Sequence, residues 1–133
     1  MYRILVAVDR NEERAKACAK AVADLPGDPG EKDVTIVYSF TDNPQGGSVT
    51  RLESVRIARD YLEDRDVPVT IDETSGDPQK VLPRVAEDID ADLIVLAGRK
   101  RSPAGKALFG SVTQSLILNS DRPVLVTGAS TAD

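Results

Sequence analysis

The sequence predicts an α/β fold of three layers, in which a five-stranded parallel sheet is covered by four helices, in one domain spanning residues 1–133. Strand-like and helix-like segments alternate along the chain. Two of the strand-like runs, ILVAV at 4–8 and DLIVLA at 92–97, are apolar throughout. Such runs are typical of central strands buried on both faces, whereas the remaining strands and helices are more polar.

The first half of the chain provides two strands and two helices. Asn11, followed by two acids, predicts the start of a helix after the first strand. Cys18 falls on the apolar stripe of that helix, so we interpret it as a core residue rather than a reactive thiol. A second strand is expected at 34–40, and Thr50 with Glu53 has the spacing of a capping box at the start of the second helix.

The second half continues the alternation. Residues 67–73 alternate in polarity, which indicates a strand at the sheet edge. Asp77 and Pro78 predict a helix start, with the aspartate as the cap and the proline in the first turn. The central strand at 92–97 follows, and a fifth strand is expected at 123–127.

Composition excludes several classes of function. The formal net charge of -5 disfavours nucleic acid and membrane surfaces as general partners. The chain has no histidine, which excludes Ser-His-Asp sites and ordinary zinc sites. A single cysteine allows no intrachain disulfide, and we find neither a signal peptide nor an apolar run long enough to span a bilayer. We therefore expect a soluble, cytoplasmic protein.

The ends of the two central strands predict a ligand site. In sheets of this class, ligands bind beyond the carboxyl ends of the strands, where the strand order reverses. Asp9 follows one central strand and Gly98 follows the other, so both border one crevice if the two strands are neighbours at the centre of the sheet. Asp9 would accept a hydrogen bond from a ribose hydroxyl, or alternatively only cap the next turn. Tyr38 and Ser39 end the second strand and are candidates to border a base.

The stretch LAGRKRSPAGKALFGSVTQSLI at 96–117 superficially resembles a phosphate-binding P-loop. A Walker motif needs four residues between its glycines and then Lys followed by Ser or Thr. Six residues separate Gly98 from Gly105, and Ala107 stands where a hydroxyl should bind the cation. We therefore reject the Walker interpretation, and the dinucleotide fingerprint is absent as well.

A helix start near Gly110 and Ser111 offers a different way to hold phosphate. Free amides and the partial positive charge of a helix N-terminus suit an anion, and the serine hydroxyl can donate to it. Alternatively, Ser111 only caps the helix. The loop before it carries four cations that either meet an anionic partner or are simply solvated: Arg99, Lys100, Arg101 and Lys106.

Four segments together resemble the universal stress protein family: ILVAVD, the GDP before the third helix, DLIVLAG, and GSVTQSLILNSDRPVLV near the end. The resemblance covers essentially the whole chain, and the last segment is its most specific part. It implies an adenine-nucleotide α-hydrolase-like sandwich with strand order 3-2-1-4-5. It also implies an ATP-binding, regulatory module of the stress response.

Nucleotide-binding members of that family resemble G-x2-G-x9-G-(S/T) after the fourth strand. The resemblance implies that the nucleotide, ATP or a related adenine nucleotide with or without Mg²⁺, is held by Asp9, Gly98, Gly110, Ser111 and Val112. Arg101 stands where the motif has its middle glycine, and the interval from Gly98 to Gly110 is one residue shorter. The guanidinium would either fill the pocket or contact phosphate directly.

These departures leave two alternatives to ATP binding: a member that does not bind ATP, with a modified basic pocket and a role in protein interaction, or a weak ATPase. Either form is expected to be a homodimer. The final strand is apolar and would lie at a sheet edge, and such edges seldom stay uncovered. The resemblance implies that it pairs with its counterpart in a second copy through Pro123, Val124, Leu125 and Val126.

Overall fold

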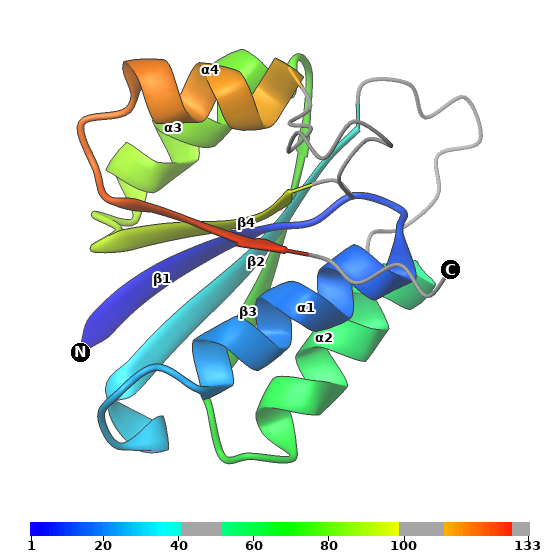
Figure 1. Cartoon of the computed structure of the whole chain (residues 1–133), viewed down its shortest axis with the longest axis vertical. Helices are drawn as coiled ribbons and strands as arrows, with labels where there is room; N and C mark the ends of the chain where they lie inside the picture. The colour runs from blue at the N-terminus through cyan, green and yellow to red at the C-terminus, as the bar shows by residue number, and fades with distance from the viewer. Residues whose placement is uncertain (41–51, 99–110, 129–133) are drawn as a thin grey trace.

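The computed structural model of the chain describes residues 1–40, 52–98 and 111–128. Within them lies one parallel sheet with strand order β3-β2-β1-β4-β5 (Figure 1), as predicted. The elements in chain order are β1 (Tyr2–Ala7), α1 (Glu12–Ala23), a short 3-10 helix (Pro29–Glu31), β2 (Lys32–Phe40), α2 (Glu53–Glu63), β3 (Val69–Ser75), α3 (Pro78–Asp88), β4 (Leu93–Gly98), α4 (Ser111–Asn119) and β5 (Val124–Gly128).

The two most apolar strands are central, as their composition predicts, and they are neighbours. β1 pairs with β4 on one side and with β2 on the other. Ile4, Leu5 and Val6 have no exposed surface, because helices cover both faces of the sheet at this point. β3 and β5 form the two edges.

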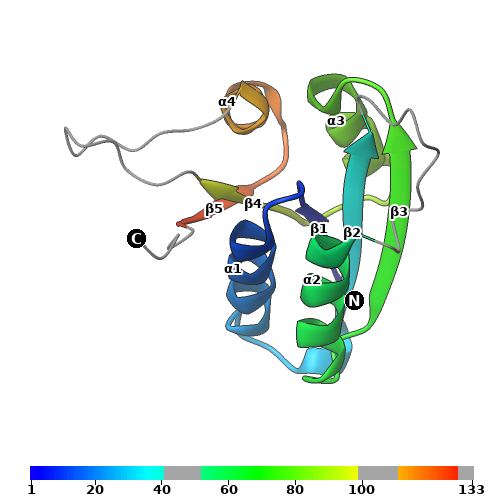
Figure 2. The same ribbon diagram turned by 90° about the vertical axis from the view of Figure 1, so that its right-hand side faces the viewer.

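The helices pack in pairs on opposite faces of the sheet, α1 with α2 and α3 with α4 (Figures 1 and 2). Successive residues of β1 therefore enter different layers of the core. Ile4 and Val6 pack with residues of α1 and α2, whereas Leu5 packs with residues of α3 and α4. This alternation follows from the two-residue period of a strand.

Two of the predicted helix starts are confirmed. The Asn11 side chain accepts a hydrogen bond from the Arg14 amide at 2.8 Å and caps α1. The Asp77 side chain accepts one from the Gln79 amide at 3.0 Å and caps α3, with Pro78 as the first helical residue. In both helices a short polar side chain satisfies an amide that has no partner inside the helix.

The capping box predicted for Thr50 and Glu53 is wrong. Glu53 is the first residue of α2 rather than the third, and Leu52 is the N-cap without any side-chain hydrogen bond. Leu52 packs against the core below α1 and α2. Hydrophobic packing thus accompanies the helix start in place of a polar cap. Thr50 lies outside the described residues.

Two strands begin later than predicted because of a proline. Pro68 and Pro123 have no amide hydrogen to donate to a neighbouring strand, so β3 begins at Val69 and β5 at Val124. Both prolines still accept a hydrogen bond through their carbonyl oxygens: Pro68 from Val34 at 3.1 Å and Pro123 from Ile94 at 2.9 Å.

Candidate functional site

The strand order reverses between β1 and β4, and two predicted site residues lie at this point. The two strands are paired up to Val6 and Val95. Asp9 and Gly98 each lie three residues beyond this last pair, so they reach the same level at the side of the sheet where its parallel strands have their carboxyl ends, the carboxyl edge. α1, which follows β1, lies on one face of the sheet, and α4, which follows β4, lies on the other (Figure 1). In sheets of this class, ligands bind at such a point, beyond the carboxyl ends of the two strands.

Ser39 reaches the same level on the other side of β1. Ala7 pairs with Val37, and Asp9 and Ser39 each follow two residues later. The structure therefore brings the backbone of three predicted site residues, Asp9, Ser39 and Gly98, to one edge of the sheet. Gly98 is buried and pairs with Gly128 of β5.

The Asp9 carboxylate is held by the first turn of α1. Its Oδ1 accepts a hydrogen bond from the Asn11 amide at 2.9 Å. Its Oδ2 accepts two from the Arg14 guanidinium, from Nε at 3.2 Å and from Nη2 at 3.0 Å. The side chain of Asp9 is nevertheless 57% exposed, so a ligand can reach it. Asp9 therefore does cap the turn that follows β1, and this leaves a binding role open.

The backbone at Asp9 is fixed by a second helix. Ser54, in the first turn of α2, is buried, and its hydroxyl donates to the Asp9 carbonyl oxygen at 2.7 Å. This bond links two segments that lie 45 residues apart in the sequence. Asp9 is thus held through its side chain by α1 and through its main chain by α2.

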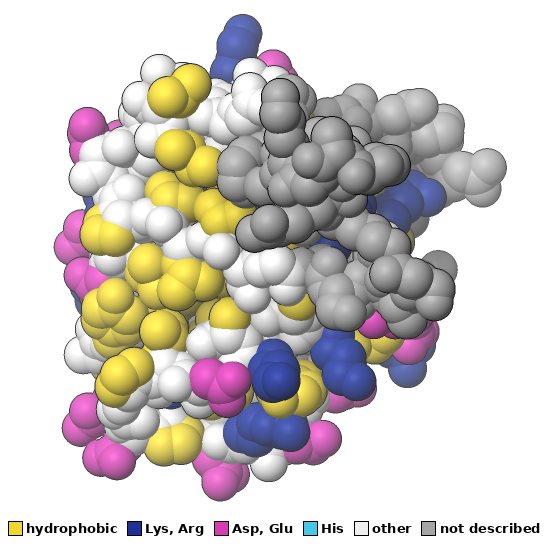
Figure 3. Space-filling view, viewed as in Figure 1, with side chains coloured by type: hydrophobic (Ala, Val, Ile, Leu, Met, Phe, Trp, Pro, Cys, Tyr) yellow, Lys and Arg dark blue, Asp and Glu magenta, His cyan; other side chains and the backbone are white. Residues whose placement is uncertain are grey.

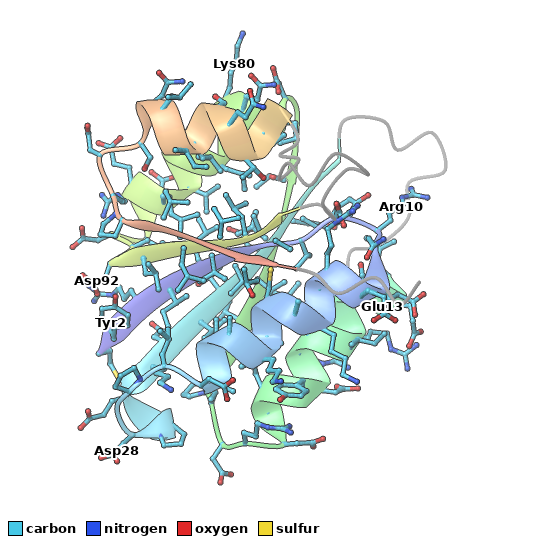
Figure 4. All side chains as sticks on the ribbon, viewed as in Figure 1. Tyr2, Arg10, Glu13, Asp28, Lys80 and Asp92 are labelled. Carbon is cyan, nitrogen blue, oxygen red and sulfur yellow. The ribbon has the colours of Figure 1, made fainter. Side chains whose placement is uncertain are left out.

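Tyr38 is a core residue whose hydroxyl reaches the same edge. Its ring packs under α1 and α2, and its exposed fraction is 8%. Its hydroxyl accepts a hydrogen bond from Nε of Arg10 at 3.1 Å. Figure 4 shows Arg10 in the turn between β1 and α1, on the opposite side of the molecule from Tyr2 and Asp92 at the amino edge of the sheet.

The first turn of α4 lies on the same side of the molecule as the strand tips (Figure 1). α4 begins at Ser111, close to the predicted start, so Ser111 is the first helical residue rather than the N-cap. Val112 packs against the core between the sheet and α3, while Thr113 and Leu116 are buried. These contacts anchor the first turn of α4, whose first amides have no partner inside the helix.

Two other predicted site residues, Arg101 and Gly110, lie outside the described residues, as does the rest of the basic loop. Among the residues that the structure describes, no group of three or more His, Cys, Asp or Glu side chains is arranged to hold a metal ion. Nor is any helix in those parts of the chain long and apolar enough to cross a membrane.

Two residues that hold Asp9, Arg14 and Ser54, were not predicted as site residues. Arg14 is three residues after the Asn11 cap and five after Asp9, a spacing at which the first helical turn brings its side chain back to the strand end. That signal was present in the sequence. Ser54 carried no such signal, because its contact depends on how α2 packs beside α1.

Comparison with known proteins agrees with this architecture. The Universal stress protein family matches residues 1–128, so the chain belongs to that family. A universal stress protein from Mycolicibacterium smegmatis is 41% identical over 66 residues, which is 49% of this chain and 51% of the relative. The chain spans about half the length of the curated relatives that it matches.

Solved structures extend the likeness over the whole fold. A universal stress protein in complex with cAMP superposes with a TM-score of 0.71 over 96% of this chain and 97% of its own, at 21% identity. One from Archaeoglobus fulgidus in complex with dAMP gives 0.68 over 96% and 98%, at 20% identity. At these identities the likeness shows the fold.

Proposed function

We propose that the chain binds an adenine nucleotide, ATP or a close relative, in the crevice between β1 and β4, as a regulatory module of the stress response. The observation that carries the proposal is the shared level of Asp9 and Gly98 where the strand order reverses. Relatives with this fold were crystallised with cAMP and dAMP, which supports an adenine nucleotide as the ligand class.

The residues of the crevice suit the parts of such a ligand. The exposed Asp9 carboxylate can accept a hydrogen bond from a ribose hydroxyl, and the amides in the first turn of α4 can donate hydrogen bonds to phosphate. Ser39 borders the base. Phosphate, with or without Mg²⁺, is proposed to be held by Gly98, Arg101, Gly110, Ser111 and Val112.

Mass spectrometry of the ligand released from freshly purified protein tests the proposal, followed by calorimetry with ATP and AMP. We expect either a co-purified adenine nucleotide or saturable binding of an added one. Ser111→Ala and Arg101→Gly then separate the contributions of the hydroxyl and the guanidinium. A protein that releases no nucleotide and shows no binding of ATP or AMP in calorimetry would refute the proposal.

A second role, as a dimeric interaction protein, is favoured by the edge strand β5. Val124, Leu125 and Val126 are only half-buried there. Figure 3 shows hydrophobic side chains gathered over β5 and α4, and α4 exposes Ile117 and Leu118. We propose that β5 pairs with the same strand of a second copy, because an uncovered apolar edge invites such pairing.

Light scattering tests the dimer with a single substitution. Val126→Lys places a charge in the proposed contact and is expected to give monomers. Thr70→Lys, on the opposite edge strand β3, is the matched control and is expected to leave the dimer intact. A dimer that survives Val126→Lys would place the contact elsewhere.

A further inference from the structure

Arg14 and Asp9 form an asymmetric ion pair. Two nitrogens of Arg14 donate to the same oxygen, Oδ2. The Arg14 side chain is 23% exposed, whereas that of Asp9 is 57% exposed. The guanidinium is therefore the more firmly embedded partner, and the carboxylate is the partner that solvent reaches.

Counting acceptor positions shows what this pairing leaves for a ligand. A carboxylate offers about four lone-pair positions, two on each oxygen. Arg14 occupies both positions on Oδ2, and the Asn11 amide occupies one on Oδ1. Within the described part of the chain, one position therefore stays open, and it belongs to Oδ1.

The main chain of Asp9 is fixed as well, because the buried Ser54 hydroxyl donates to its carbonyl oxygen at 2.7 Å. With the backbone held by Ser54 and Oδ2 held by Arg14, the carboxylate has one defined orientation. A group fixed in this way loses little freedom when it binds a ligand, and this favours affinity.

We propose that Arg14 is a positioning residue of the nucleotide site: by occupying Oδ2 it presents Oδ1 of Asp9 to one ribose hydroxyl, and so sets the discrimination against the analogue that lacks this hydroxyl. This inference rests on the proposed function of the crevice. Arg14 itself does not touch the nucleotide. Its planar guanidinium is essential, because a lysine ammonium keeps the charge but cannot donate two bonds in a fixed geometry.

The test is calorimetry of AMP, 2′-deoxy-AMP and 3′-deoxy-AMP with wild type and Arg14→Lys. We expect Arg14→Lys to weaken AMP binding about fivefold. The affinity for the deoxy analogue that lacks the hydroxyl bound by Asp9 should fall by less than about twofold between wild type and Arg14→Lys, because that contact is already missing. In an Asp9→Asn background, Arg14→Lys should have no further effect on AMP.

Arg56→Lys is the matched control, because Arg56 forms an exposed ion pair with Glu53 on the neighbouring helix α2. It should leave all three affinities unchanged, and thermal unfolding should show that both variants fold. If Arg14→Lys weakens the binding of AMP and of both deoxy analogues equally, or weakens the binding of none of them, Arg14 has no positioning role. If the wild type binds none of the three, the proposed function fails, and this inference fails with it.

Discussion

Lys32 is a buried lysine at the start of β2, and replacing it with methionine tests how α1 is held. Its exposed fraction is 3%. Its ammonium donates to three carbonyl oxygens at the end of α1, those of Leu25 at 2.7 Å, Val22 at 3.2 Å and Ala23 at 3.4 Å. Carbonyls at a helix C-terminus lack the usual partner inside the helix, and the ammonium supplies a donor to them. The Val22 carbonyl also accepts a hydrogen bond from the Leu25 amide at 3.1 Å, so there the ammonium is an additional donor.

The contacts of Lys32 set the size of the effect. A hydrogen bond from a charged donor contributes about 1.5–3 kcal/mol, and only the contact to Leu25 is short. Burying the ammonium opposes this gain, and methionine removes that penalty. We therefore expect Lys32→Met to lower the free energy of unfolding by about 2 kcal/mol. With a urea m-value of about 1.5 kcal/mol/M, the midpoint should fall by about 1.3 M.

Lys80→Met is the control, since Lys80 projects away from α3 into solvent (Figure 4). Its midpoint should change by less than about 0.3 M. Equilibrium urea unfolding followed by circular dichroism measures both variants. A Lys32→Met protein as stable as wild type would mean that desolvation of the ammonium cancels its three hydrogen bonds, and the reasoning would be refuted.

Other residues allow independent tests. Burial first, and the Asp9 charge second, raise the pKa of the Cys18 thiol from 9.0 to about 12, so a disulfide reagent should modify it only after unfolding. Between pH 9.0 and about 12 the unfolded state loses the thiol proton and the folded state keeps it, so the free energy of unfolding, unaffected below pH 9.0, should fall as pH rises. Urea titrations across this pH range should show a smaller fall for Cys18→Ala. Ser54→Ala removes the bond to the Asp9 carbonyl and should lower stability by about 1 kcal/mol. Asp77→Ala, which removes the cap on Gln79, should lower it by a similar amount in the same titration.

The central position of two strands was predictable because they have a distinctive composition. Runs such as Ile4–Val8 are typical of strands buried on both faces, whereas the order that makes β1 and β4 neighbours was predicted only from the family resemblance. Strand ends were less predictable. The predicted fifth strand included Pro123, but β5 begins one residue later because proline has no amide hydrogen to donate. A polar cap was predicted for α2, but its N-cap is Leu52, which makes no side-chain cap hydrogen bond and packs against the core instead.

The candidate site was predictable where it depends on strand ends. Asp9, Ser39 and Gly98 lie at one edge because parallel strands finish together. The partners of Asp9 were not predicted, for two different reasons. Arg14 is a local contact that the helix period places beside Asp9, whereas Ser54 reaches it only through the packing of α2 against α1.

A nuclear magnetic resonance titration with AMP tests whether the nucleotide binds at the carboxyl ends of β1 and β4. Binding there should give saturable shifts of the backbone amides of Asn11, Ser39, Gly98 and Ser111, with no change for Arg3 and Asp92 at the opposite edge of the sheet. Shifts that gather around Arg3 and Asp92, or a spectrum that AMP leaves unchanged, would contradict it.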